Sequence, residues 1–297
     1  MLDSIERIYN EPMHKHSTFK IGGNAKVVYF PKNKGEFVEL LLHLKREDER
    51  YFVVGNGSNL LFDDRGFDGS IICTGGMADC SYEYKPDHVV IYAEAGKRLT
   101  ELSLEAGKKH ALTGLEFAYG IPATVGGAVY MNAGAYGGQM ADVVLDIEAY
   151  DTDKNEIVTI DNAGADFSYR HSVFEENKSL VVLSVRLRLA LGDAKEIAEK
   201  MDTNMKSRRD KQPLEFPSAG STFKRPVGYF AAKLIDDAGL KGYTVGGARV
   251  SEKHAGFVIN AGGATCADVR ALMDDVSRIV KEKFGVELSP EIIYLPY

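Results

Sequence analysis

Residues 114–138, GLEFAYGIPATVGGAVYMNAGAYGG, decide the fold that this sequence predicts. The stretch holds seven glycines and one charged side chain, Glu116, in twenty-five residues. Glycine lacks a Cβ, so backbone of this composition approaches a ligand closely or adopts positive φ angles. Apolar residues between the glycines suit a flat aromatic ring, and backbone N–H groups suit phosphate oxygens. We interpret this glycine floor as one wall of a cofactor site; the alternative is a set of buried turns in a compact core.

A second glycine-rich segment supports the cofactor interpretation. The apolar run Tyr51–Val54 stops at Gly55-Asn56-Gly57-Ser58-Asn59. A strand followed by a glycine-rich turn directs successive backbone N–H groups at an anion, which is the arrangement of a phosphate cradle. The segment has neither the lysine of a P-loop nor the G-x-G-x-x-G spacing, so neither standard nucleotide motif applies.

Composition limits the remaining possibilities. The 297 residues suffice for about two domains. With 36 Lys and Arg against 43 Asp and Glu, the net charge of −7 argues against a nucleic-acid partner. The three cysteines share no metal-ligand spacing with the seven histidines, so we expect free cytosolic thiols and no metal site. No signal peptide or long apolar run is visible, so we expect a cytoplasmic protein without a membrane partner.

The order of elements predicts an α+β chain. Strand candidates are residues 25–30, 51–54, about 70–74, 88–96, 143–151, 156–160 and 180–191, and the glycine floor itself. In 180–191, Leu183, Val185, Leu187 and Leu189 alternate with Ser184, Arg186 and Arg188, as in a half-buried strand. Helices are expected over about 35–47, 98–111 and 193–209. Two more are expected from Phe230 to Gly239 and from Thr265, a plausible N-cap, to Gly285. A strand-rich segment covers 241–260. We place a boundary near residue 190, after a cofactor unit.

Three polar residues stand where packing does not require them. They are Arg170 in Ser168-Tyr169-Arg170-His171, Ser221 in the segment 217–224, PSAGSTFK, and Glu291 after Pro290. Taken singly, each has a more common explanation. Arg170 could pair with a surface carboxylate, Ser221 could be a turn or helix-cap residue, and Glu291 could be a carboxylate at an element edge.

Taken together, the motifs resemble one family. They are HSTFKIGG, VVGNGSNLLF, the glycine floor, SYRHSVF, PSAGSTFKRP, SEKHAGFVIN and the terminal PE, spread from about residue 13 to 291. In this order they are similar to the UDP-N-acetylenolpyruvoylglucosamine reductase (MurB) family. The resemblance implies an FAD-binding fold of the vanillyl-alcohol-oxidase (PCMH) type over residues 1–190, in subdomains of about 1–70 and 71–190. A C-terminal α+β substrate-binding domain would cover 191–297.

The resemblance also implies roles for individual residues. Arg170, Ser221 and Glu291 match the catalytic residues of the family. The cofactor-binding positions would be Gly55, Asn56, Gly57, Ser58, Asn59, Leu60, Gly120, Ile121, Pro122, Thr124, Gly126, Gly127, Asn132 and Gly134. Substrate contacts would be Tyr136, Arg208, Lys211 and Arg225. Arg225 stands where some members carry asparagine, a state we associate with a shorter subgroup that lacks an extra substrate loop.

The implied reaction is the FAD-dependent reduction of UDP-N-acetylglucosamine enolpyruvate to UDP-N-acetylmuramate by NADPH, a cytoplasmic step of peptidoglycan precursor synthesis. Arg170 would stabilise the developing enolate, Ser221 would protonate it, and Glu291 would be protonated or paired with Arg170. NADPH and the sugar nucleotide would alternate at one flavin, and we expect a monomer. The alternatives are another flavin oxidoreductase of the same fold and a non-catalytic nucleotide-sugar sensor.

Overall fold

The computed structural model describes residues 4–297, and their backbone forms two compact units built from separate stretches of sequence. Unit 1 contains the described residues up to Arg7 with Tyr29–Asn56 and Ile71–Ser207. Unit 2 contains Ile8–Val28, Gly57–Ser70 and Arg208–Tyr297. The division at residue 190 and the subdomain division near residue 70 stay predictions. The first three residues of the predicted cofactor unit lie outside the described residues.

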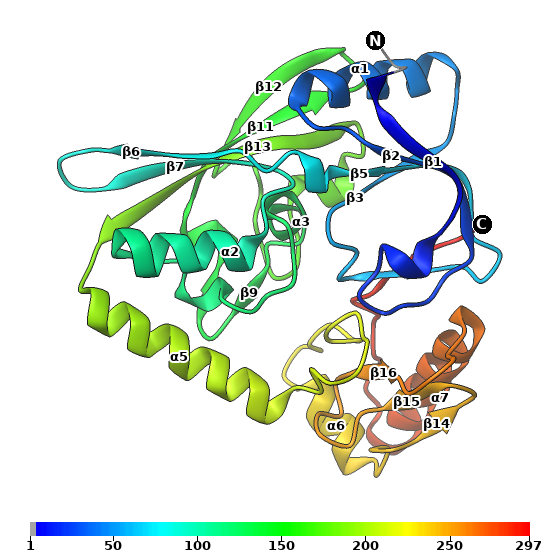
Figure 1. Cartoon of the computed structure of the whole chain (residues 1–297). Helices are drawn as coiled ribbons and strands as arrows, with labels where there is room; N and C mark the ends of the chain where they lie inside the picture. The colour runs from blue at the N-terminus through cyan, green and yellow to red at the C-terminus, as the bar shows by residue number, and fades with distance from the viewer. Residues whose placement is uncertain (1–3) are drawn as a thin grey trace. The chain divides into compact units, whose positions relative to one another are not determined.

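The largest sheet belongs to unit 1. Its strands are β6 (Cys80–Tyr84), β7 (Val89–Glu94), β8 (Leu112–Thr113), β11 (Val144–Asp151), β12 (Glu156–Asp161) and β13 (Leu180–Leu191). The order is β12-β11-β13-β7-β6, with β8 paired to the end of β13 (Figure 1). The predicted alternation in β13 is confirmed for Val185 and Leu187, which are fully buried, and for Arg186, which is exposed. Ser184, predicted on the polar face, is also buried and lies opposite the buried Glu94.

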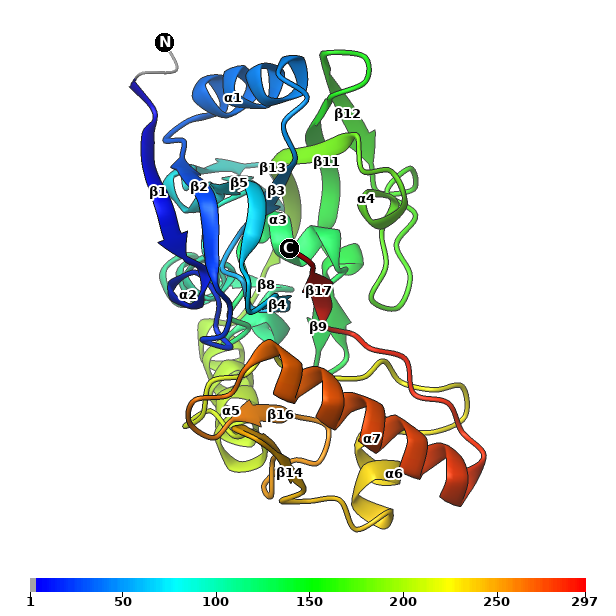
Figure 2. The ribbon, with the colours of Figure 1, turned by 90° about the vertical axis from the view of Figure 1, so that its right-hand side faces the viewer.

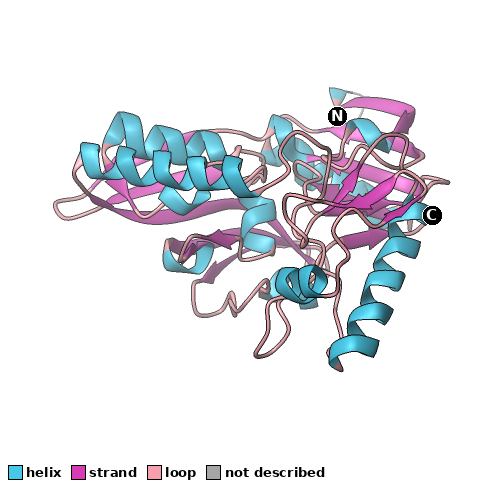
Figure 3. Ribbon diagram, turned by 90° about the horizontal axis from the view of Figure 1, so that it is seen from below, coloured by secondary structure: helices cyan, strands magenta, loops and turns pink. Residues whose placement is uncertain are grey.

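Unit 1 also contains helices, drawn cyan in Figure 3. They are α1 (Lys34–Arg46), α2 (Leu99–Leu104), α3 (Val125–Tyr130), α4 (Val173–Glu176) and α5 (Ala194–Lys211), whose last turn belongs to unit 2. Leu102 of α2 and Val129 of α3 share one apolar core with Val185 and Leu187 of β13. The helix predicted over 98–111 is present as α2 followed by a wider π-helical turn, Glu105–Lys109. In the described part of the chain, no helix is both long and apolar enough to cross a membrane.

The glycine floor is not a strand, so that prediction was wrong. It consists of a 3-10 turn (Glu116–Ala118), the short helix α3, and two-residue strands β9 (Gly134–Ala135) and β10 (Gly138–Gln139). Positive φ angles recur along it, at Gly114, Gly120, Asn132, Tyr136 and Gly137. Extended backbone requires negative φ, so these residues interrupt any strand.

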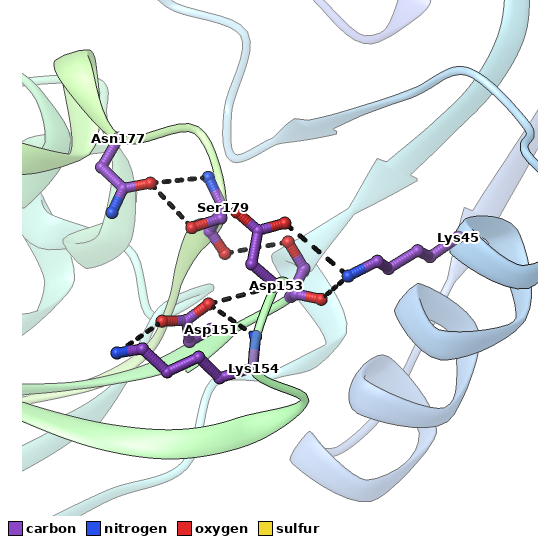
Figure 4. A network of polar contacts seen from close by, with 7 residues as sticks. Lys45, Asp151, Asp153, Lys154, Asn177 and Ser179 are labelled. Atoms are coloured by element: carbon purple, nitrogen blue, oxygen red, sulfur yellow. Dashed lines mark hydrogen bonds and ion pairs between the residues drawn. The ribbon is translucent and has the colours of Figure 1, made fainter.

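A four-stranded sheet has the order β1-β2-β5-β3. Its strands are β1 (Glu6–Pro12), β2 (Asn24–Phe30), β3 (Tyr51–Val54) and β5 (Phe67–Cys73). In unit 1, α1 is tied to the turn between β11 and β12 (Figure 4). The Lys45 ammonium donates to the carbonyl of Thr152 and lies 3.7 Å from Asp153, while the Thr152 N–H donates to Ser179 O at 2.9 Å. Asp151 accepts from the N–H groups of Asp153 and Lys154, which fixes the turn.

Unit 2 holds β4 (Leu60–Phe62), β14 (Thr244–Val245), β15 (Ala248–Val250), β16 (Val258–Asn260), β17 (Ile293–Leu295), α6 (Ala231–Asp237) and α7 (Cys266–Phe284). Strands β14, β15 and β16 form one antiparallel sheet, as the strand-rich segment 241–260 predicts. The last strand, β17, pairs in parallel with β4 (Figure 2). The start of the predicted helix at Phe230 needs correction. Phe230 precedes α6 as its N-cap and is 60% exposed, so the helix begins at Ala231 and not at Phe230.

Helix α7 has the predicted ends. Thr265 Oγ1 accepts from the N–H of Asp268 at 3.0 Å, Asp268 accepts from the N–H of Thr265, and Gly285 follows the helix at φ 70°. Val269, Leu272 and Val276 are fully buried. Ile279 is only half-buried, and Val280 fills the core in the last turns.

This capping box generates a stability prediction. Thr265→Ala should lower the free energy of unfolding by about 1 kcal/mol, because it leaves a helix N–H without its acceptor.

Hydrogen bonds from the N–H groups of Thr265 and Gly247 lower the pKa of Asp268 below its usual value. Stability from Asp268 is therefore present above the pKa of the unfolded chain and is lost as pH falls through the lower folded pKa.

Urea titrations between pH 3 and 7 check both statements. Asp268→Asn should show a smaller loss of stability on acidification than wild type. Equal acid dependence in the two proteins would contradict the assignment.

Candidate functional site

In unit 1 the start of the predicted phosphate loop lies against the glycine floor. The Asn56 carboxamide donates to Pro122 O at 2.7 Å. A Cβ built on Gly55 would lie 2.2 Å from Thr124 Oγ1, so only glycine fits there. Thr124 is the N-cap of α3 and accepts from the N–H of Gly127 at 3.3 Å. Five residues predicted from two motifs therefore lie together.

Several floor glycines are required by the protein's own packing. A Cβ on Gly126 would lie 2.9 Å from that of Ala95, and one on Gly134 would lie 2.7 Å from the carbonyl oxygen of Gly138. Gly127, by contrast, is exposed and would meet nothing closer than 3.4 Å. The buried-turn alternative thus explains part of the glycine content. Gly127 and the exposed Pro122 remain accessible on the surface of the floor.

The backbone at Gly120 and Ile121 is held by α2. Thr100 Oγ1 accepts from the N–H of Gly120 at 3.2 Å and donates to Ile121 O at 2.8 Å. One threonine hydroxyl therefore satisfies both a donor and an acceptor of this loop.

Glu116, the one charge in the floor, is a buried anchor that sequence reasoning did not assign. Its side chain is 3% exposed and accepts from Thr113 Oγ1 and from the N–H of Gly114. Burial raises the pKa of Glu116, but these hydrogen bonds outweigh it, so the pKa lies below its usual value. Asn204 of α5 donates to Glu116 O at 3.2 Å, and Lys200 lies 3.6 Å from the carboxylate. These contacts fasten α5 to the floor.

Arg170 lies at a tight turn beside the end of the floor. Ser168 and His171 exchange backbone hydrogen bonds, and Arg170 adopts φ 55°, which is rare for a residue with a side chain. Its guanidinium donates to Gly134 O at 3.0 Å and lies 5.2 Å from the ring of Tyr169. Tyr136, predicted to contact substrate, is 41% exposed in the same hairpin as Gly134.

Asn132 holds this turn in place. Its side chain is 1% exposed and donates to Ser168 O at 2.8 Å and to Gln139 Oε1 at 3.2 Å, while its oxygen accepts from the N–H of Ala141. From the other side, Ser172 Oγ donates to Tyr130 O at 2.7 Å. The Arg170 turn is thus attached to the floor at several points.

In unit 2 the rest of the phosphate loop presents donors. Gly57 adopts φ 59°, and a Cβ there would lie 2.1 Å from His16 O. Its carbonyl accepts from the N–H of Thr18 at 3.2 Å. Within residues 4–297, the N–H groups of Gly57, Ser58 and Asn59 donate no backbone or side-chain hydrogen bond. Convergent backbone N–H groups of this kind suit phosphate oxygens.

Ser221 and Glu291 lie in neighbouring backbone segments of unit 2. The N–H of Glu291 donates to Thr222 O at 2.8 Å, and Phe223 forms a bridge with Pro290. Ser221 is exposed, whereas Thr222 is buried and accepts from Val258 N through its hydroxyl. Asn59 Nδ2 donates to Glu291 O at 3.0 Å, a contact that no sequence pattern predicted.

The predicted basic substrate residues also lie in unit 2. Arg208 is 6% exposed, and its guanidinium donates to Gln212 Oε1 at 3.3 Å. Lys211 is exposed at the end of α5, and Arg225 lies 4.7 Å from the ring of Phe230. Arginine beside an aromatic ring is common at sites that bind planar or anionic ligands.

Comparison with known proteins shows which family the chain is similar to. A profile of the UDP-N-acetylenolpyruvoylglucosamine reductase C-terminal domain matches residues 212–295, and a profile of an FAD binding domain matches residues 25–161. The UDP-N-acetylenolpyruvoylglucosamine reductase of Caldanaerobacter subterraneus is 48% identical over 95% of this chain and 91% of its own length. That of Streptococcus pneumoniae is 44% identical over 98% of this chain and 95% of its own length.

The chain belongs to the UDP-N-acetylenolpyruvoylglucosamine reductase family. The resemblance stated from the sequence motifs is confirmed, whereas the assignment to the shorter subgroup stays a prediction. Among solved structures, the reductase from Thermus caldophilus has a TM-score of 0.80 at 33% identity, covering 98% of this chain and 99% of its own. Cholesterol oxidase from B. sterolicum has a TM-score of 0.50 at 14% identity over 64% of this chain, which shows the fold alone.

The predicted α+β FAD-binding fold of the PCMH type is confirmed, and FAD is the cofactor. The residues fit this group. The N–H groups at 57–59 suit its phosphates, and the Gly127 surface offers backbone without side chains. Which individual residues of the family site contact FAD stays a prediction.

Gly55 provides a test of the loop packing. Gly55→Ala would place a methyl group on Thr124 Oγ1 and displace either the loop or the α3 cap, so the purified protein should carry less FAD and unfold at a lower temperature. The measurement is the ratio of flavin to protein absorbance together with the melting temperature. Gly75→Ala is the matched control, because a Cβ there meets nothing within 4 Å. Equal FAD content in both variants would contradict the prediction.

Proposed function

We propose that this protein reduces UDP-N-acetylglucosamine enolpyruvate to UDP-N-acetylmuramate with NADPH, a step of peptidoglycan precursor synthesis. The observation that carries the proposal is the likeness to reductases of this substrate along 95% of the chain. The loop 55–60 and the glycine floor would hold FAD, which would supply the hydride chemistry between NADPH and the terminal vinyl carbon of the substrate. The protein acts as a cytoplasmic monomer.

Arg170 stabilises the charge that develops during reduction. Addition at the vinyl carbon leaves negative charge on the next carbon, delocalised into the substrate carboxylate. A guanidinium is permanently charged, and its planar fork matches a carboxylate. Because the turn at residues 168–171 is fixed to the floor, this cation is held in place before the charge appears, which is the condition for effective electrostatic catalysis.

Ser221 protonates the carbanion and Glu291 supports the site. A hydroxyl is a weak acid, but the carbanion is a strong base, so the proton transfer is favourable. Ser221 is exposed in unit 2, and the backbone bond from Glu291 N to Thr222 O holds the two residues in adjacent segments. Glu291 is either protonated or paired with Arg170, because a free carboxylate would repel the substrate's charge.

Ligand contacts follow the family pattern. The loop 55–60 binds the FAD phosphates, and Gly120, Ile121, Pro122, Thr124, Gly126, Gly127, Asn132 and Gly134 line the flavin. Tyr136, Arg208, Lys211 and Arg225 contact the sugar nucleotide, with the basic residues on its carboxylate or diphosphate. NADPH and the sugar nucleotide use one site in turn.

An absorbance titration tests the function. The purified protein should show a flavin band that bleaches with NADPH without oxygen and returns when UDP-N-acetylglucosamine enolpyruvate is added. UDP-N-acetylglucosamine is the control ligand, because it lacks the double bond. A reduced flavin that the enolpyruvyl sugar leaves unchanged would refute the proposal.

Ser221→Ala tests the proton donor. The variant should bind FAD and be reduced by NADPH normally, while turnover falls about 10²- to 10⁴-fold. Ser218→Ala is the matched control in the same segment. Stopped-flow traces of flavin absorbance separate the two half-reactions. Normal turnover by the flavin-loaded Ser221 variant would show that another group donates the proton.

A further inference from the structure

The backbone N–H and the backbone carbonyl of Glu291 are each held by a residue distant in sequence. Its N–H donates to Thr222 O at 2.8 Å, and its carbonyl accepts from Asn59 Nδ2 at 3.0 Å. Two residues later, the N–H of Ile293 donates to Asn59 O at 2.9 Å. Asn59 therefore contacts this segment through both its side chain and its backbone. All four residues belong to unit 2.

We propose that Asn59 is a positioning residue for Glu291, linking the orientation of that carboxyl group to the loop that binds the FAD phosphates. The inference rests on the proposed function of Glu291. It assigns Asn59 a task that phosphate binding alone does not require, because its carboxamide is directed to a protein carbonyl.

The two contacts of Asn59 differ in what they demand of the residue type. The bond from Ile293 N to Asn59 O is a backbone bond, and any residue at position 59 makes it. The bond to Glu291 O needs a side-chain donor of short reach, which asparagine provides. Aspartate would place an acceptor against an acceptor, and an aliphatic residue would leave the half-buried carbonyl without this partner. The carboxamide is thus the part of Asn59 specific to Glu291.

The contact between Asn59 and Glu291 is also connected to the predicted phosphate loop, because Asn59 belongs to that loop. The N–H groups of Gly57, Ser58 and Asn59 donate no hydrogen bond within the described residues, so a bound phosphate would order them. Ordering the backbone of Asn59 also orders its carboxamide, and with it the peptide of Glu291. Since Thr222 O already accepts from the N–H of Glu291, the backbone of Glu291 is then held at both its N–H and its carbonyl.

Asn59→Ala tests the inference in the FAD-loaded protein. Reduction by NADPH should stay within about 2-fold of wild type, while reoxidation by the enolpyruvyl sugar slows about 10-fold, because small displacements of a catalytic group are costly. In the Glu291→Gln background the same change should cost less than about 2-fold, since both act through one group. Amide hydrogen exchange across residues 288–295 should quicken in Asn59→Ala and should respond less to added FAD.

Asn260→Ala is the matched control. Its carboxamide also donates to a backbone carbonyl of unit 2, that of Phe19 at 3.3 Å, and its oxygen accepts from the N–H groups of Gly262 and Ala264. The variant therefore reports the cost of losing all the bonds of a carboxamide in unit 2 without touching Glu291. It should leave the ratio of the two half-reactions unchanged.

Three results would overturn the inference: equal slowing of both half-reactions, an additive effect with Glu291→Gln, or weaker FAD binding with normal reoxidation. The last would make Asn59 a phosphate contact alone. If the wild-type flavin is not reoxidised by the enolpyruvyl sugar, the proposed function itself fails. That outcome is distinct from a defect confined to the Asn59 variant.

Discussion

The parallel pairing of β17 with β4 is the contact on which the arrangement of unit 2 depends. Ile293, Tyr294 and Leu295 lie opposite Leu60, Leu61 and Phe62, and the N–H of Asp63 continues the ladder to Leu295 O at 3.0 Å. The Tyr294 hydroxyl adds a bond to the Asp63 carboxylate. Because β4 follows directly from the phosphate loop and β17 follows directly from Glu291, this register decides which loop residue meets Glu291. A shift of one residue would take Asn59 away from that carbonyl and reverse every side chain of the strand.

Glycines near the cofactor loops meet two different demands. Gly55, Gly57 and Gly126 are required by neighbouring protein atoms, since a Cβ on any of them would overlap Thr124, His16 or Ala95. A Cβ on Gly127 would meet Thr124 Oγ1 at an ordinary contact distance of 3.4 Å, and this glycine presents exposed backbone. Glycine density in a sequence does not separate these causes, because close approach by the chain itself and close approach by a ligand select the same residue. The distinction appears only when the neighbours are known.

The elements that the sequence predicted well are those set by local rules. Helix α7 begins at Thr265 and ends before Gly285 because capping side chains and a left-handed glycine act within one turn. Strand β13 follows from the alternation of apolar residues. The glycine floor was mistaken for a strand because its course depends on backbone angles at Asn132 and Tyr136 that residue type alone does not dictate. The bond from Asn59 to Glu291 joins residues 232 positions apart and follows from strand register, which one sequence does not reveal.

The surroundings of Arg170, a proposed catalytic residue, show how backbone strain is maintained in a turn. Asn132, Tyr136 and Arg170 all adopt positive φ without being glycine, and each such residue costs about 1 kcal/mol or more. Three hydrogen bonds oppose that cost, from Asn132 to Ser168 O, from Ser172 to Tyr130 O and from Arg170 to Gly134 O. Each contributes about 1 kcal/mol when its groups are shielded from water. The strain cost of the three residues is comparable to the stabilisation by the three hydrogen bonds, so the turn keeps its shape only while it is attached to the floor. The Arg170 guanidinium is thus positioned by its turn and by the glycine floor to which the turn is attached, and changes in the floor will therefore alter its placement.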